Sequence, residues 1–314
     1  MQSGRFSCAL LLFVNSFHAL SLAPIHESKS VRIGGINQWI DVRGEDDQNP
    51  VLLYLHGGPG SSVISYADRF TKELQKHFVL VFWDQRASGK TKTLNPPEKN
   101  MTATQFERDA IEVIAYLTKR FNKKKVFLAG HSWGGFLGLK VAANHPELLS
   151  AYFAIAPMVY QNESERQSLS FMKEIAQNKN NKNAIAELTT IKIPFENGTQ
   201  LYYHRKWLTY LIDMHKPDFS KAYVENWATT WLSLFNEASA ENFAETAPEI
   251  NCPIYFLEGR KDYQTYFKLT EGYYQKLKAE KKELFWFDNS SHSLNLSEPG
   301  KFQEVIISIL KKKL

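Results

Sequence analysis

Ser132 lies at the centre of the string GHSWGG, residues 130–135. A short apolar run, residues 126–129, precedes this string, and a helical stretch of small residues, 136–144, follows it. Between a strand and a helix, the pattern G-x-S-x-G forms a sharp turn that holds the serine hydroxyl clear of the sheet. Glycines fit there because a side chain would collide with the adjacent strand and helix. The pattern predicts a nucleophilic serine and acyl-transfer chemistry.

A serine hydroxyl is a weak nucleophile at neutral pH, so Ser132 needs a histidine to take its proton and a carboxylate to orient that histidine. Four histidines follow it in the chain: His145, His204, His215 and His292. His145 falls in the helix that leaves the serine turn, and the next two fall in a region without predicted strands. We therefore predict His292, in the loop after the last predicted strand, as the base.

Asp262 follows the predicted strand at residues 253–257. Asp213 and Asp218 fall in the region without strands, and Asp288 is only four residues from the predicted base. Ligands in open α/β folds bind at the carboxyl edge of the sheet, and the order serine, acid, histidine is usual there. Asp262 is therefore predicted as the acid.

Acyl transfer also requires donors for the oxyanion, each worth about 3 kcal/mol of barrier. The string HGGPG, residues 56–60, follows the apolar run 51–55 and supplies a loop whose backbone can approach a ligand closely. We assign the two donors to the backbone N–H groups of Gly58 and Trp133. His56 is interpreted as a structural hydrogen-bonding residue rather than a base.

The elements that position these groups alternate between continuous apolar runs and amphipathic helices. Residues 31–42 predict a strand pair bent at residues 34–35, and Thr102 with Gln105 forms a capping box that opens a helix. Further strands are expected at residues 51–55, 78–83, 126–129 and 151–156. This alternation predicts an α/β protein whose mostly parallel sheet is covered by helices on both faces.

The strand-helix alternation stops at residue 161 and resumes at residue 248. The region between, residues 161–247, is polar and rich in aromatic residues, and predicts helices at 202–214 and 223–235 and a loop at 178–183. The later predicted elements are strands at 253–257 and 284–287 and helices at 266–278 and 299–311, the last capped by Ser297. We interpret residues 28–160 and 248–314 as one core and residues 161–247 as an inserted helical cap.

The chain has 314 residues, of which 43% are hydrophobic and 23% charged, and a formal net charge of +5. This composition is that of a globular protein, and the small charge without a basic stripe argues against a nucleic-acid partner. We find no motif for a metal or a nucleotide, so no cofactor is expected. The oligomeric state stays open.

The N-terminus has the layout of a secretory signal. Arg5 precedes an apolar segment, residues 6–17, and small residues follow at positions 19 and 21. We expect cleavage after Ser21, export to the periplasm or the medium, and no membrane association afterwards; a buried N-terminal helix is the alternative. Cys8 lies in this segment, so the mature chain would keep Cys252 and no internal disulfide.

Taken together, the motifs resemble the proline iminopeptidase branch of the α/β-hydrolases. They are HGGPG at 56–60, WDQRASG at 83–89, GHSWGG at 130–135, GRKD at 259–262 and the loop at His292. The resemblance implies an α/β-hydrolase fold and an exopeptidase that removes an N-terminal residue, often proline, from short peptides. It places nucleophile, acid, base and oxyanion donors on the residues selected above. Residues 84–86 match a motif outside this triad, and we expect them to brace the site.

In some members of this branch, a glutamate after the catalytic acid helps to hold the ammonium group of the substrate. Here Tyr263 and Gln264 follow Asp262, so the amine would be held by carboxylates of the cap. The candidates are Glu187, Glu196, Glu225 and Glu237. Aromatic residues of the cap, Trp207, Tyr210, Trp227, Trp231 and Phe235, form either the wall of a proline pocket or the core of the cap itself.

Three functions remain open from the sequence. The first is a serine aminopeptidase that acts through an acyl-enzyme on short peptides. The second is a carboxylic-ester or amide hydrolase with the same triad, which the missing glutamate after Asp262 favours. The third is a binding protein without catalysis, which the complete set of catalytic residues disfavours.

Overall fold

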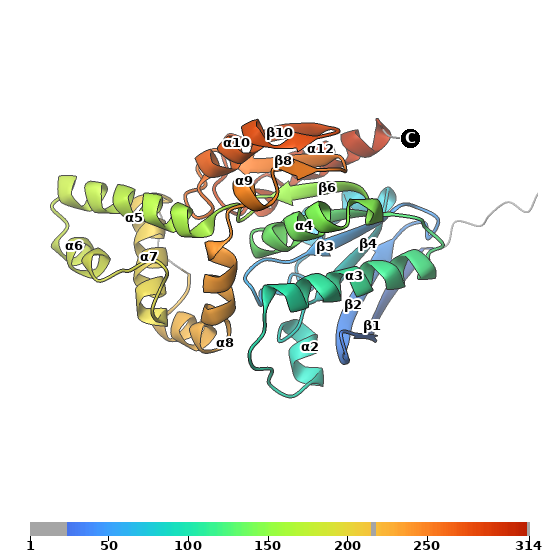
Figure 1. Ribbon diagram of the computed structural model, residues 1–314, viewed down its shortest axis with the longest axis horizontal. Coiled ribbons are helices and arrows are strands. Elements are labelled where there is room, and N and C mark those ends of the chain that lie inside the picture. Colours follow the sequence, from blue (N-terminus) through green and yellow to red (C-terminus); the bar gives the residue numbers. More distant parts are fainter. Residues whose placement is uncertain (1–23, 215–217, 313–314) are drawn as a thin grey trace, which may run out of the picture.

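The computed structural model describes residues 24–214 and 218–312 of the chain. Its centre is an eight-stranded sheet with the strand order β1-β2-β4-β3-β5-β6-β8-β10 (Figure 1). The strands are β1 (Ile25–Ile33), β2 (Ile36–Gly44), β3 (Val51–Leu55), β4 (Val79–Asp84), β5 (Val126–His131), β6 (Leu149–Ile155), β8 (Ile254–Gly259) and β10 (Lys282–Phe287). From β4 to β10 all neighbours are parallel, whereas β1 and β2 form an antiparallel hairpin at one edge, as predicted.

The parallel strands are continuous apolar runs because both of their faces are covered. Successive residues of a strand point to opposite faces, and in β3 Leu53 belongs to one hydrophobic core whereas Leu52 and Tyr54 belong to the other. The first core contains side chains of α3 (Ala103–Arg120), α4 (Trp133–Asn144) and α10 (Phe267–Lys276). The second contains side chains of α1 (Asp68–Thr71) and α12 (Pro299–Lys311).

Shorter elements connect these layers. They are η1 (Glu73–Lys76), α2 (Gly89–Leu94), η2 (Pro146–Leu148), α9 (Phe243–Thr246), α11 (Leu294–Ser297) and a two-stranded sheet of β7 (Glu249–Ile250) and β9 (Lys278–Ala279). Thr102 caps α3 as predicted, its side chain accepting the N–H of Gln105. The prediction that Ser297 caps the last helix is wrong. Ser297 ends α11 and bonds to Ser290, and α12 starts instead at Pro299, whose fixed φ suits the first turn.

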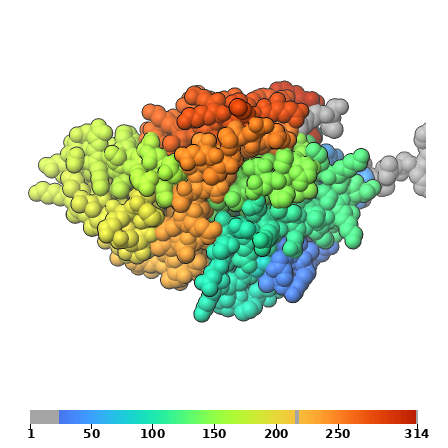
Figure 2. All heavy atoms as spheres, in the orientation of Figure 1, coloured from blue at the N-terminus to red at the C-terminus, as the bar shows by residue number. Residues whose placement is uncertain are grey.

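Four helices between β6 and β7 form a lobe at one end of the molecule (Figures 1 and 2). They are α5 (Gln161–Asn178), α6 (Lys182–Thr189), α7 (Gly198–Leu211) and α8 (Lys221–Ala240). The predicted helices at 202–214 and 223–235 correspond to α7 and α8, but α5 and α6 were not predicted. The buried side of α5 is polar over its first turns, with Gln161, Ser164 and Glu165, and apolar only from Leu169 onward. Its first half therefore lacks the apolar periodicity on which such a prediction depends.

The predicted signal, residues 1–21, lies outside the described residues. Within the residues that are described, no helix is both long enough and apolar enough to cross a membrane.

Candidate active site

Ser132 occupies a strained turn between β5 and α4. Its φ of 57° and ψ of −115° lie in a region that residues other than glycine rarely adopt. The flanking glycines are required by close packing: a Cβ on Gly130 would overlap the carbonyl of Gly134, and one on Gly134 would overlap the carbonyl of Leu55. The turn therefore presents the serine at the carboxyl edge of the sheet.

Asp262 follows β8, and its fully buried carboxylate is surrounded by donors. Its Oδ1 accepts the backbone N–H groups of Gln264 (2.8 Å) and Thr265 (3.0 Å), and its Oδ2 accepts the Thr265 hydroxyl (2.7 Å). The Nδ1 of His292 lies 2.8 Å from the same Oδ2. Burial alone would raise the pKa of Asp262, but His292 and the bonds from Thr265 outweigh it and lower that pKa. Because a carboxylate can only accept, Nδ1 of His292 carries the proton and Nε2 is free to act as a base.

His131 fixes the loop of His292 next to the serine. Its Nε2 donates to the backbone carbonyl of His292 over 2.9 Å, and the two ring centroids are 4.8 Å apart. Burial, together with the nearby His292, lowers the pKa of His131 to about 4, so its ring is neutral at pH 7. Among the described residues, Ser132 Oγ makes no hydrogen bond to His292. Such bonds often tighten only when substrate is bound.

The two predicted oxyanion donors belong to segments close to Ser132. Gly58, with a φ of 116°, lines the same cavity as the serine, and a Cβ on the adjacent Gly57 would lie 3.4 Å from the Cβ of Ser132. Trp133 is the first residue of α4. Its N–H therefore has no acceptor within the helix and is available to a ligand. The N–H groups of Gly58 and Trp133 stay the predicted donors to a tetrahedral intermediate.

Gln85 joins the segments that carry these donors. Its Oε1 accepts the indole N–H of Trp133 over 2.8 Å, and its Nε2 donates to the backbone carbonyl of His56 over 3.2 Å. Gln85, His56 and Trp133 are all buried, and burial lowers the pKa of His56. One side chain therefore connects the loop of Gly58 to the start of α4.

A cavity of about 720 Å³ opens between the core and the cap. Its lining combines Ser132 and Gly58 of the core with apolar cap residues, among them Leu201, Val224 and Trp227. Two charged side chains also line it, Arg205 and Asp218. This arrangement can hold a small substrate with its carbonyl at Ser132.

The four cap glutamates predicted to hold an amine are not among the residues that line this cavity, as far as the described chain extends. Each is bound elsewhere: Glu187 to Lys206 and Trp207, Glu196 to Lys192, Glu225 to Thr199 and Glu237 to the backbone of Ala103. Of the aromatic residues considered for a pocket wall, Trp227 and Phe235 line the cavity, whereas Trp231 packs against Gly60 and Phe106. The correction has a simple reason, since charged residues on helices are usually solvated or paired.

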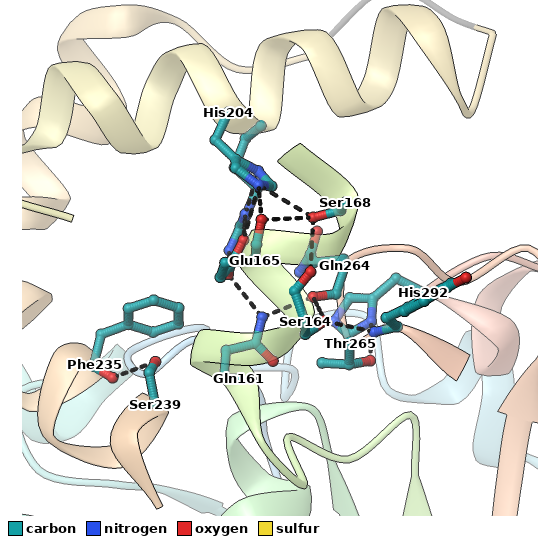
Figure 3. A network of polar contacts seen from close by, with 12 residues as sticks. Gln161, Ser164, Glu165, Ser168, His204, Phe235, Ser239, Gln264, Thr265 and His292 are labelled. Atoms are coloured by element: carbon teal, nitrogen blue, oxygen red, sulfur yellow. Dashed lines mark hydrogen bonds and ion pairs between the residues drawn. The ribbon is translucent and has the colours of Figure 1, made fainter. Parts of the chain in front are cut away.

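The sequence analysis missed a buried polar cluster in the cap (Figure 3). Glu165, which is 1% exposed, makes a two-pronged ion pair with Arg205 and accepts a bond from Gln161. His204 lies against it, and burial, only partly offset by Glu165, lowers the pKa of His204 to about 4. The available sequence signal was the spacing of polar residues at 161, 164, 165 and 168, which matches one face of a helix.

Comparisons with known proteins agree with this geometry. The sequence model of the alpha/beta hydrolase fold family matches residues 50–262. The probable aminopeptidase YbaC of Bacillus subtilis is 30% identical over 305 residues, covering 88% of this chain and 94% of its own length. The proline iminopeptidase of Thermoplasma volcanium is 31% identical over 119 residues, 38% of each chain. The crystal structure of a Mycobacterium smegmatis proline iminopeptidase superposes with a TM-score of 0.64 at 16% identity, covering 91% of this chain and 98% of that one. The predicted fold is confirmed.

Proposed function

The chain belongs to the α/β-hydrolase family, in the branch of the proline iminopeptidases, and from that premise we propose that it is a serine aminopeptidase. It would release N-terminal proline or another small residue from short peptides. The observation that carries the proposal is one cavity whose lining includes both Ser132 and the acidic residue Asp218. The similarity to a probable aminopeptidase over most of the chain supports it.

The charges around the cavity suit an ammonium group. Burial would raise the pKa of Glu165, but Arg205, His204 and the bonds to Glu165 lower it overall, so Glu165 is ionised and balances Arg205. His204, with a pKa of about 4, is neutral at pH 7. Asp218 therefore supplies the net negative charge, which attracts a protonated N-terminus.

In the proposed reaction, the Oγ of Ser132 attacks the carbonyl carbon of the N-terminal residue while His292 Nε2 takes the hydroxyl proton. The N–H groups of Gly58 and Trp133 bind the oxyanion, and Asp262 holds the imidazolium through Nδ1. The C–N bond then breaks, and His292 gives its proton to the leaving amine. Water, activated by the same imidazole, hydrolyses the acyl-enzyme and releases the free amino acid.

The experiment compares three substrates: proline naphthylamide, its N-acetyl form and p-nitrophenyl butyrate. We expect the free-amine substrate to be hydrolysed and the acetylated one to be much poorer, because only the former can pair with Asp218. The D218N variant should raise KM for proline naphthylamide about tenfold, a loss of about 1.4 kcal/mol in binding. Its KM for the butyrate ester should not change.

E196Q is the matched control, because Glu196 is also an acidic residue of the cap but pairs with Lys192 outside the cavity. It should behave as the parent enzyme with all three substrates. Hydrolysis of the ester alone would overturn the proposal in favour of a carboxylic-ester hydrolase.

Export is part of the proposal and rests on the sequence. Arg5, the apolar segment 6–17 and the small residues that follow it support a cleaved signal. N-terminal sequencing of the exported protein should start at Leu22, and recovery of the uncleaved chain from the cell interior would contradict export.

A further inference from the structure

The cap touches the catalytic acid through one peptide unit. The carbonyl of Gln264 accepts bonds from two side chains of α5, Gln161 Nε2 at 2.7 Å and Ser164 Oγ at 3.1 Å. The N–H of the same peptide unit, that of Thr265, donates to Asp262 Oδ1 at 3.0 Å. A trans peptide is planar, with its C=O and N–H pointing in opposite directions. The cap therefore holds one end of a rigid unit whose other end donates to Asp262. Figure 3 shows Gln161 and Ser164 of the cap beside Gln264.

Ser164 holds the loop at a second point. Its Oγ accepts the backbone N–H of Tyr266 over 2.7 Å while it donates to Gln264. A hydroxyl has one donor and two acceptor positions, so one side chain binds the loop on both sides of Thr265. Ser164 and Gln161 are each only 2% exposed. Water is thus a poor substitute for either bond.

Gln161 is fixed from the cap side. Its Nε2 also donates to Glu165 Oε1 over 2.7 Å, and Glu165 is paired with Arg205 on α7. Gln161 and Arg205 line the cavity together with Gln264 and Thr265. The polar network therefore runs without a break from the wall of the cavity to the acid.

We infer that Ser164 and Gln161 are positioning residues for Asp262, so that the cap takes part in the chemical step and not only in substrate selection. The inference rests on the proposed roles of Ser132, Asp262 and His292. It implies that loss of Ser164 lowers kcat even for an ester too small to reach the cap. A loop that shifts by about 1 Å can cost up to 100-fold in rate.

The test is S164A with p-nitrophenyl acetate. We expect kcat to fall roughly tenfold or more, with KM unchanged. The matched control is S239A: Ser239 is 1% exposed and lies on cap helix α8, but its Oγ donates only to the carbonyl of Phe235 in its own helix. Removing that buried hydroxyl should leave kcat as in the parent. A fall in kcat that is no larger for S164A than for S239A would overturn the inference.

A double-mutant cycle with D262N separates positioning from a general loss of stability. If Ser164 acts through Asp262, S164A should have no further effect on kcat in the D262N background. Effects that multiply would refute the inference. Should S164A not fold, Q161M replaces it, because this variant removes the other bond to the Gln264 carbonyl. Its kcat is then measured alone and in the D262N background. Failure of the proposed function is recognised separately: the parent would then not hydrolyse proline naphthylamide, whatever S164A does with the ester. Failure of the proposed triad would leave the parent inactive on the ester or S132A active.

Discussion

The site has two halves that are positioned by different physical means. In the core half, backbone contacts place Ser132, Gly58 and Trp133: glycines pack against strands, and a helix starts at the serine turn. In the cap half, buried side-chain hydrogen bonds from Gln161 and Ser164 position the loop of Asp262. Backbone sterics leave motifs in a sequence, whereas a buried polar network leaves only ordinary polar residues. The halves thus differ in how well a sequence predicts them and in how substitutions should impair them.

The largest effect should follow from removing the nucleophile. S132A is expected to lower kcat by about 10⁴-fold or more, because the serine, histidine and acid act as one unit. Labelling by a fluorophosphonate should be lost in S132A and retained in E196Q. Persistent turnover by S132A would mean that Ser132 is not the nucleophile and that the core half does not perform the chemistry.

The fold and the core half follow closely from sequence patterns. The strand at Val51–Leu55 was predicted with its bounds, and Ser132 lies at the predicted strand-to-helix turn. Asp262 and His292, chosen as the remaining candidates, are joined by a hydrogen bond. These residues lie together because parallel strands bring their carboxyl ends to one edge, so position along the chain specifies position in space. Their catalytic roles stay predictions.

The cap half could not be predicted in the same way. Glutamates chosen there by residue type, such as Glu187 and Glu237, are bound outside the cavity. Asp218, rejected as the acid, lines it. Helices of an inserted region have no sheet to fix their register, so their charges can face any direction. Which carboxylate faces the serine depends on tertiary packing that periodicity does not encode.

Both halves should respond to acid, because each contains a histidine whose pKa is lowered to about 4. Burial lowers the pKa of His131 in the core and of His204 in the cap to about 4. Between pH 4 and pH 6.5 the unfolded chain binds a proton at each that the folded chain does not, so the free energy of unfolding rises with pH there. Each histidine adds about 1.4 kcal/mol per pH unit, or about 3 kcal/mol over this window, lost as pH falls.

Urea unfolding between pH 4.5 and 7.5 measures this slope. H204Q and H131Q should each reduce it by a similar amount. Only H131Q should also lower kcat at pH 7, because His131 holds the His292 loop. An unchanged slope in H204Q would show that the cap histidine is not kept neutral by burial.

The smallest effect tests whether a side chain also positions the core half. Two buried glutamines make similar bonds. Gln85 accepts from Trp133 Nε1 at 2.8 Å and donates to a backbone carbonyl at 3.2 Å, and Gln38 does the same with Trp83 and the carbonyl of Ile33. Gln38 also donates to Asp109 Oδ2 over 2.7 Å. Of the two, Gln85 connects the segments that carry the predicted oxyanion donors. Q85M should therefore lower kcat roughly 10- to 30-fold with KM unchanged, whereas Q38M should not.

Both variants leave a tryptophan N–H and a carbonyl without their partner, so both should lose about 1–3 kcal/mol of stability. Q38M also removes the bond to Asp109 and should lose at least as much as Q85M. Comparing Q85M with Q38M therefore separates a loss of stability from a loss of positioning at the active site. Equal losses of kcat in Q85M and Q38M would mean that Gln85 acts only through stability, and that backbone contacts alone place the oxyanion donors. A loss confined to Q85M would mean that the core half, too, depends on a buried side chain, one that the sequence marks only because it lies within the motif at residues 83–89.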